Sequence, residues 1–325
     1  MRFSRRDFLL LSLGVGGGAL TSRWLSRMPP LRGRPAIAGG SPRAAQDSVY
    51  GAMTAPPDEL GAAALDAVTL PPPPRRGRQD VELWVGEQSV AVGRGRVMPA
   101  WTFNGRIPGP IIRATEGDEV AVHFRNLGAR PHNLHFHGAH EIAADGWEPV
   151  PPGGEVLHRF HAGPAGLHPY HCDMTPAPDH ISHGLYGVLI VDPPSGRPPA
   201  REIVLTLGGF DTDSDGRSDL VGWNGVAGFY MKYPLKVRAG ELVRVYVTNM
   251  LGDVPVITFH LHATVFDVFR SGTVRGPSER SDVVTLAPAE RAILEFRLPE
   301  RGRYMFHPHQ AQLAEHGAMG WFAAV

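Results

Sequence analysis

The chain has 325 residues, 42% of them hydrophobic, and its 32 basic and 32 acidic side chains cancel. This length allows one large or two ordinary domains with a sizeable core. The balanced charge argues against nucleic acid or an anionic membrane surface as the main partner. A single cysteine, Cys172, cannot form an intramolecular disulfide, so it is a metal ligand, a free thiol or part of an intermolecular bond.

The N-terminus carries an export signature. The segment SRRDFLL, residues 4–10, places paired arginines ahead of an apolar run that ends near residue 20, and this pattern is typical of cargo for the twin-arginine export machinery. The run is too short and too rich in glycine to be a stable membrane anchor. We therefore predict a signal peptide over residues 1–38, with a small-residue cleavage motif at 36–38, and a periplasmic or extracellular location.

Residues 39–78 form a segment rich in Pro, Ala, Gly and Arg that ends in a run of prolines at 71–74. No helical or strand period holds there, and proline runs favour extended, solvated chain. We predict a disordered linker.

From residue 79 onward, apolar and polar residues alternate in short runs, which is the pattern of half-buried β-strands. The runs occupy 81–92, 119–126, 155–162, 188–194, 201–210, 234–250, 256–269, 291–299 and 302–309. GDEVAVHFRN ahead of NLHFHG in the first half is echoed by GELVRVYVTN ahead of TFHLHA in the second. We predict an all-β chain of two similar Greek-key β-sandwich domains, residues 79–195 and 196–325.

The loop DTDSDGRSD, residues 211–219, partly matches a calcium-binding loop. Oxygen-bearing side chains and Gly216 stand at the expected positions, but the position that needs a bidentate Glu is Gly222. We favour a solvated acidic turn and leave calcium as the alternative.

The stretch HPYHCDMTPAPDHISHGLYG, residues 168–187, holds Cys172 directly after His171 and eight residues before His180. A thiolate with imidazoles on both sides suits copper, which favours one cysteine and two histidines in a trigonal site. The second histidine must come from elsewhere, and PHNLHFHG, residues 131–138, offers three. The alternative is a buried structural cysteine, but the recurrence of histidine clusters along the chain favours a metal.

Three H-x-H pairs also lie on β-type sequence, namely His135 with His137, His260 with His262, and His307 with His309. Residues two apart on a strand point to the same face, so both members of a pair can reach one shared site. Repeated pairs of this kind indicate metal ligands rather than exposed polar residues.

The motifs FNGRIPGP, PHNLHFHG, HPYHC, HGLYGVLIVDP, FHLHATVF and FHPHQAQLAEHGAMG follow one another in this order. Through them, residues 79–325 resemble the cupredoxin-fold multicopper oxidases, and among these the two-domain, laccase-like kind with type 1 copper in the first domain. The copper-containing nitrite reductases are related and share the two-domain plan.

The resemblance implies that His132, Cys172 and His180 bind a type 1 copper, where a reducing substrate gives up electrons singly. The axial position falls at Leu185, where many relatives have methionine. Leucine cannot coordinate copper, and the loss of an axial donor should favour the reduced ion and raise the potential.

The resemblance also implies a trinuclear, dioxygen-reducing cluster. The type 2 copper would be held by His135 and His260, and the type 3 pair by His137, His171, His262, His307 and His309. The peptide link from Cys172 to His171 would carry electrons between the centres, and four electrons reduce dioxygen to water. Because each domain supplies half of the ligands, the resemblance implies a homotrimer in which neighbouring subunits complete the site.

One position departs from the family pattern, which expects a further ligand histidine where this chain has Asp173. A carboxylate is a harder ligand than imidazole, so we expect up to four coppers per chain, or fewer if the type 3 pair is weakly held. By strand alternation, Asp173 should face the cluster together with His171. We assign it a catalytic role beside Cys172 and His171, as a ligand, as an acceptor that orients a histidine, or as a general acid.

The leading functional prediction is an exported oxidase that takes single electrons from small reductants, phenols or metal ions, and passes them to dioxygen. One alternative is a nitrite-reductase-like enzyme, with one further copper on His137, His171 and either His307 or His309. The resemblance counts against it, because nitrite reductases carry an acid where His135 stands. The other alternative is a non-enzymatic blue-copper electron-transfer protein, which leaves the second-domain histidines without a role.

Overall fold

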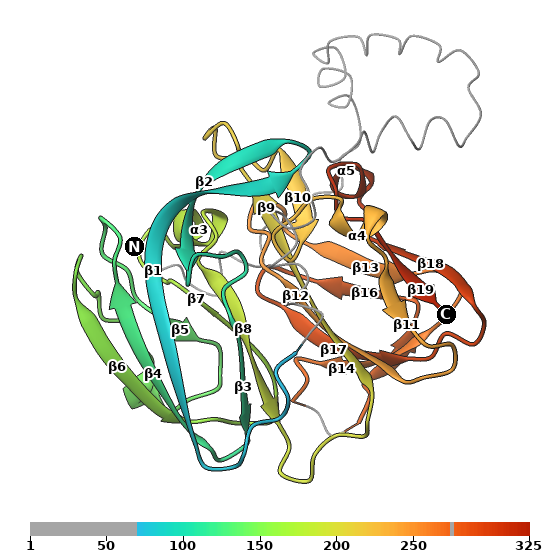
Figure 1. Cartoon of the computed structure of the whole chain (residues 1–325), viewed down its shortest axis with the longest axis horizontal. Helices are drawn as coiled ribbons and strands as arrows, with labels where there is room; N and C mark the ends of the chain where they lie inside the picture. Colours follow the sequence, from blue (N-terminus) through green and yellow to red (C-terminus); the bar gives the residue numbers. More distant parts are fainter. Residues whose placement is uncertain (1–69, 274–275) are drawn as a thin grey trace, which may run out of the picture. The chain divides into compact units, whose positions relative to one another are not determined.

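The computed structural model describes residues 70–273 and 276–325 (Figure 1). The predicted signal peptide and most of the predicted linker lie outside the described residues. The described helices are short: the 3-10 helix η2 (Ile142–Ala144), α3 (Ala177–Ser182), α4 (Phe229–Lys232) and α5 (Ala311–Glu315). Within the described ranges, no helix is both long enough and apolar enough to cross a membrane.

The first half of the described chain is a sandwich of two four-stranded sheets. Their strand orders are β2-β1-β4-β6 and β3-β8-β7-β5. The strands are β1 (Arg78–Gly93), β2 (Arg96–Phe103), β3 (Ile111–Thr115), β4 (Glu119–Asn126), β5 (His135–Phe136), β6 (Glu155–His161), β7 (Gly166–His171) and β8 (Tyr186–Asp192). One apolar cluster joins the sheets, with Val85 and Phe124 from one and Tyr170 and Leu189 from the other.

The second half repeats this plan with a six-stranded and a five-stranded sheet, in the orders β10-β9-β12-β17-β14-β15 and β11-β19-β18-β13-β16. The strands are β9 (Arg201–Phe210), β10 (Leu220–Trp223), β11 (Leu235–Val237), β12 (Val243–Asn249), β13 (Ile257–Leu261), β14 (Phe266–Arg270), β15 (Glu279–Ser281), β16 (Val283–Leu286), β17 (Arg291–Phe296), β18 (Gly302–His307) and β19 (Gly320–Ala324). The prediction of an all-β chain with two sandwiches is confirmed.

The two halves share their strand pairing and even their turns. β1 runs parallel to β4 and β3 to β8, and in the second half β9 runs parallel to β12 and β11 to β19. Asn104 and Asn224 both adopt positive φ, 54° and 55°, a conformation that asparagine tolerates better than most residues. The side-chain oxygen of Asn104 accepts the N–H of Trp84 at 2.7 Å, and that of Asn224 accepts the N–H of Thr206 at 2.9 Å.

The sheet that contains β8 packs against the sheet that contains β12, so these two strands have a covered surface on both faces. All seven residues of each strand are buried, which explains why both read as nearly continuous apolar runs. The seam includes Val188 and Ile190 from the first half and Tyr246 and Ile293 from the second.

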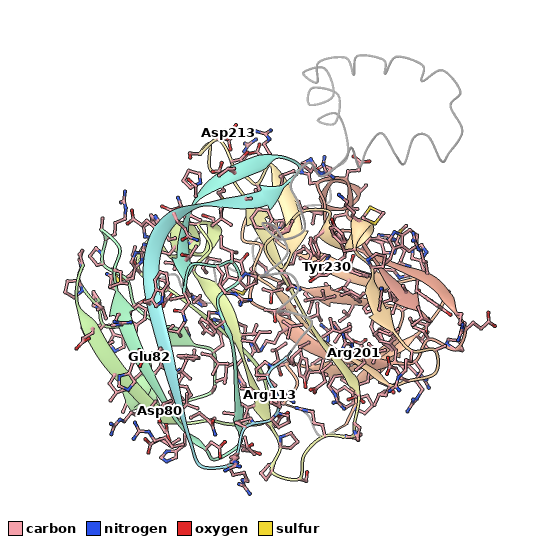
Figure 2. All side chains as sticks on the ribbon, in the orientation of Figure 1. Asp80, Glu82, Arg113, Arg201, Asp213 and Tyr230 are labelled. Carbon is pink, nitrogen blue, oxygen red and sulfur yellow. The ribbon has the colours of Figure 1, made fainter. Side chains whose placement is uncertain are left out.

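A buried ion network crosses the same seam. Arg113 on β3, labelled in Figure 2, lies 2.7 Å from the Asp192 carboxylate and 3.0 Å from that of Glu202 on β9. Glu202 also pairs with Arg244 at 3.2 Å, and Arg244 pairs with Glu295 at 2.6 Å. The Arg113 and Asp192 side chains are only 5% and 6% exposed, so neither charge can be left without its partner at low cost.

We expect Arg113→Ala to lower the free energy of unfolding by about 3–5 kcal/mol, because Asp192 and Glu202 would keep buried charges without their shared partner. Thermal or urea denaturation measures the loss. The matched control is Arg78→Ala, since Arg78 and Asp80 form an exposed pair, which should change stability little. Equal effects of the two substitutions would contradict the structural role given to Arg113.

Candidate metal centres

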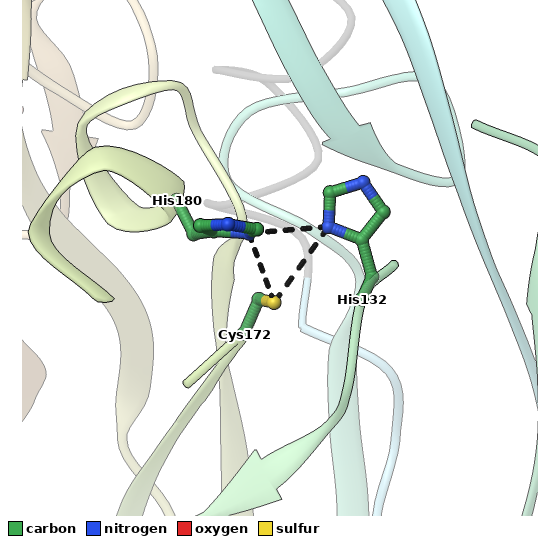
Figure 3. A group of neighbouring side chains, drawn as sticks. All are labelled: His132, Cys172 and His180. Atoms are coloured by element: carbon green, nitrogen blue, oxygen red, sulfur yellow. Dashed lines mark hydrogen bonds between the residues drawn. The ribbon is translucent and has the colours of Figure 1, made fainter. Parts of the chain in front are cut away.

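The fold brings His132, Cys172 and His180 together in the first half, as Figure 3 shows. His132 lies in the loop after β4, Cys172 follows the last residue of β7, and His180 lies on α3. The Cys172 sulfur lies 3.2 Å from Nδ1 of His180 and 3.7 Å from Nδ1 of His132, and the two nitrogens are 3.2 Å apart. We call these residues the triad. All three are buried.

Asn133, which the sequence analysis did not single out, connects the two loops that carry the triad. Its backbone N–H donates to the Cys172 sulfur at 3.4 Å. Its side-chain oxygen accepts the N–H of Asp173 at 2.6 Å, and its side-chain amide donates to the carbonyl of Trp147 at 3.0 Å. These bonds fix the thiol relative to His132 before any ligand binds.

The triad suits a soft cation. Burial raises the pKa of Cys172 to about 11, although the backbone N–H groups of Asn133 and Met174 act in the opposite direction. Burial, followed by the charge of His180, lowers the pKa of His132 to about 4. Without a cation the site is therefore a neutral thiol beside neutral imidazoles. A soft cation would displace the thiol proton and bind the nitrogen lone pairs, and one sulfur with two imidazoles is the donor set of a blue-copper site.

Leu185 is fully buried in the same apolar cluster as Cys172, and its carbonyl accepts the Cys172 N–H at 3.1 Å. Its side chain offers no donor atom for a metal. Of Leu185 and the triad, only His132, Cys172 and His180 therefore offer strong donor atoms to a metal.

A second group, here called half-site 1, consists of His135, His137 and His171. His135 on β5 stands opposite His171 on β7 in the strand register. The Nε2 atoms of His137 and His171 are 2.7 Å apart. Burial, followed by the charges of His171 and His135, lowers the pKa of His137 to about 3, so its lone pair is free at neutral pH.

A third group, half-site 2, repeats this geometry in the second half with His260, His262 and His307. His260 on β13 stands opposite His307 on β18, and the Nε2 atoms of His262 and His307 are 2.9 Å apart. The ring of His309 lies 4.7 Å from that of His260, measured between centroids. His262 and His309 are exposed in the single chain.

The hydrogen bond at Nδ1 of each ring decides whether its Nε2 atom carries a proton or a lone pair. The Nδ1 atoms of four histidines contact oxygen acceptors. For His171 and His307 the acceptor is the carbonyl of the following residue, Cys172 at 3.0 Å and Pro308 at 2.9 Å. For His260 it is the Asp282 carbonyl at 2.8 Å, and for His135 the Asp145 carboxylate at 2.8 Å. An imidazole that donates from Nδ1 presents a lone pair at Nε2. The Nε2 lone pairs of His171 and His307 therefore face the Nε2 atoms of His137 and His262 at 2.7 and 2.9 Å. Neutral imidazole nitrogens that converge in this way fit metal ions, which would displace the proton shared by each pair.

Asp145 and His140 are residues that the sequence analysis missed. Asp145 follows η2, and its Oδ1 lies 2.8 Å from Nδ1 of His135 and 3.5 Å from Nε2 of His140. The His140 side chain is 7% exposed and its Nε2 also contacts the Phe136 carbonyl at 2.6 Å. A carboxylate that accepts the Nδ1–H of a metal-binding histidine orients the ring and raises its basicity.

The remaining predicted residue, Asp173, lies outside half-site 1. Its side chain is exposed, and its backbone N–H is held by Asn133. Among the described residues, no group of converging ligand atoms includes Asp173, and none combines histidines of half-site 1 with those of half-site 2. The single chain therefore presents two separate half-sites.

The acidic loop between β9 and β10 brings Asp211, Asp213 and Asp219 together, and Figure 2 shows Asp213 at its outer end. Asp211 already accepts the backbone N–H of Gly216 at 2.8 Å, and Asp219 accepts that of Thr212 at 2.9 Å. A turn held by its own backbone accounts for these contacts, and calcium stays an untested alternative.

Comparison with known proteins places this geometry among copper enzymes. Multicopper oxidase family models match residues 85–196 and 196–325. A solved multicopper oxidase is 38% identical, with a TM-score of 0.75, over 77% of this chain and 90% of that one. A copper nitrite reductase from Nitrosomonas europaea is 29% identical, with a TM-score of 0.72, over 76% and 94%. A copper-containing nitrite reductase of Neisseria meningitidis serogroup A is 31% identical over 74% of this chain and 68% of its own length.

We expect Asp145→Asn to weaken copper binding at half-site 1 by about 10–100-fold, because the amide accepts a weaker hydrogen bond and His135 loses its orientation. Competition titration with a chelator measures the affinity. Glu148→Gln is the control, since Glu148 is an exposed carboxylate that belongs to no group of converging ligand atoms among the described residues. An equal loss from the control would contradict the role given to Asp145.

Leu185→Met should lower the reduction potential of the copper-loaded triad, because a thioether donor stabilises the oxidised ion. Spectroelectrochemical titration measures the potential, and Leu185→Ile provides a control without a donor. A potential that does not fall in the methionine variant would show that residue 185 is not the axial position.

Proposed function

The chain belongs to the multicopper oxidase family of copper-dependent oxidoreductases, and we propose that it takes single electrons from small reductants and passes them to dioxygen. The observation that carries this proposal is the duplicated geometry of the half-sites. In each, histidines from two neighbouring strands present converging Nε2 lone pairs. A protein that needed only a one-electron centre would have no use for both.

We propose that His132, Cys172 and His180 hold the type 1 copper, with Leu185 in the axial position. Bound copper would supply one-electron redox chemistry at the triad and four-electron reduction of dioxygen to water at the cluster. Asn133 holds the thiol in place, and burial of the triad excludes water. His171 directly precedes Cys172 in the chain, and its Nδ1–H donates to the Cys172 carbonyl at 3.0 Å, so covalent and hydrogen-bonded paths lead from the triad to half-site 1.

We propose that half-site 1 of one chain and half-site 2 of a neighbouring chain together form the cluster. His135 and His260 would hold the type 2 copper, and His137, His171, His262, His307 and His309 the type 3 pair. The exposure of His262 and His309 in the single chain supports a site that another subunit covers. A contact between unlike half-sites closes into a ring, and the resemblance implies that this ring is a homotrimer.

Asp173 keeps its proposed place beside the cluster, because it stands two residues from His171 where the resemblance expects a histidine. An exposed carboxylate at this point can bind metal, or deliver protons to reduced oxygen, once a second chain covers it. The copper content is therefore four per chain if Asp173 acts as a ligand and lower if it does not.

A nitrite-reductase-like activity is the second candidate, because several relatives are copper-containing nitrite reductases. It would need one further copper, on His137, His171 and one histidine of half-site 2. His135 and its support from Asp145 count against this function, because they add a nitrogen donor where nitrite reductases carry an acid. An electron-transfer protein without catalysis is less well supported still, since it would use the triad alone.

We also propose export by the twin-arginine route to the periplasm or the cell exterior. The N-terminal SRRDFLL motif supports it. This route carries folded proteins, which suits a chain whose metal sites are fitted before transport.

Cys172→Ser should abolish the intense visible band of the copper-loaded protein and its oxidase turnover, because the band requires the thiolate. Absorption spectroscopy and oxygen uptake are the measurements, with circular dichroism to verify the fold. If oxidised, copper-loaded wild-type protein has no thiolate-to-copper band, the type 1 assignment is wrong.

Mixing variants tests the shared cluster. We expect His137→Ala to inactivate half-site 1 and the double variant His307→Ala/His309→Ala to inactivate half-site 2, so each should be inactive alone. Random co-assembly of equal amounts should restore both intact half-sites at about a quarter of the interfaces of a ring. Oxygen uptake by the mixture measures the recovery, and each variant reassembled with itself is the control. A fully active monomer by light scattering would rule out a shared site.

A further inference from the structure

The triad is almost closed to solvent. His132 and Cys172 are 0% exposed and His180 is 6% exposed, so a reductant in solution meets at most one edge of one ligand. A half-buried side chain, Trp101 on β2, packs against the apolar cluster that contains Cys172. Among the described residues, Trp101 is the tryptophan whose ring contacts the triad, and it is also partly exposed.

The indole of Trp101 contacts both histidines of the triad. Its ring centroid lies 4.8 Å from that of His180 and 5.4 Å from that of His132, with the rings edge to face. The ring also stacks on His183 at 4.2 Å with an angle of 14° between the planes. The backbone N–H of Trp101 donates to the His183 carbonyl at 3.0 Å. This bond links β2 to the end of α3, and together with the ring contacts it holds the indole beside the His180 ring.

A cation lies over the indole. The guanidinium of Arg130, an exposed residue, lies over the ring at 5.4 Å from its centroid, and the loop that carries Arg130 also has the apolar side chain of Leu127, 59% exposed. Of the acidic groups close by, Glu87 already accepts the N–H of Ala129 at 2.9 Å, and Asp179 lies on α3. Such a surface suits a planar, electron-rich ring, which gains from contact with an aromatic edge and a cation.

We infer that Trp101 is the contact through which a phenolic reductant delivers electrons to the triad. This inference rests on the proposed function. Each encounter removes one electron from the phenol, which releases its proton to water and leaves as a phenoxyl radical. Copper held by His132, Cys172 and His180 would accept that one electron. The indole carries the electron across the gap between the docked ring and the His180 imidazole and is not itself consumed.

Anaerobic stopped-flow spectroscopy tests the inference by following the bleaching of the visible band after copper-loaded protein is mixed with hydroquinone. We expect the second-order rate constant to fall at least about fivefold in Trp101→Leu and by less in Trp101→Phe, which retains an aromatic ring. Trp84→Leu is the matched control, because Trp84 is half-buried on the neighbouring strand β1 and should leave the rate unchanged.

Two further measurements separate electron entry from a structural effect. The visible band and the potential should stay close to wild type, because Trp101 is not a ligand. Copper binding should quench less of the tryptophan emission in Trp101→Phe than in wild type, because the indole nearest the triad is gone.

Equal bleaching rates in wild type and both Trp101 variants would overturn the inference while leaving the proposed function intact. A potential shift large enough to account for the slower rate would also overturn it. Absence of the band in wild type would instead overturn the proposed function, and the inference with it.

Discussion

The structure depends on one constraint, which is the direction in which each ligand histidine donates its proton. His171 and His307 donate from Nδ1 to the carbonyl of the neighbouring residue, so their Nε2 lone pairs point at the Nε2 atoms of His137 and His262. Each of these lone pairs can accept a proton from the facing ring or bind a cation that displaces that proton. The β-strand registers that pair His135 with His171 and His260 with His307 impose this arrangement in both halves.

Duplication of one sandwich explains how the chain acquired two half-sites but a single triad. The equivalent strands β7 and β18 end in His171 and His307, and each is followed by a short helix, α3 or α5. After these histidines the first half has Cys172 and the second has Pro308. A soft sulfur ligand is therefore available only once per chain. The buried ion network around Arg113 and Glu202 then holds the two halves in a fixed relation.

The sequence allowed the strands, the duplicated plan and the convergence of H-x-H pairs to be predicted, because these follow from periods of two along a strand. Contacts that depend on how loops fold could not be predicted from the sequence. Asp145 reaches His135, and Trp101 reaches His132 and His180, only in the folded chain. The position of Asp173 beside the cluster stays a prediction, since β7 ends at His171, where strand alternation stops fixing side-chain directions, and the Asp173 side chain is exposed in the single chain.

The identity of the electron acceptor tests the central claim most directly. Copper-loaded wild-type protein with excess hydroquinone should be supplied with dioxygen in one experiment and with nitrite, under anaerobic conditions, in another. The account predicts uptake of one dioxygen for every four electrons removed from the reductant, and negligible consumption of nitrite. Steady nitrite consumption with little or no uptake of dioxygen would contradict it and would establish the nitrite-reductase-like alternative.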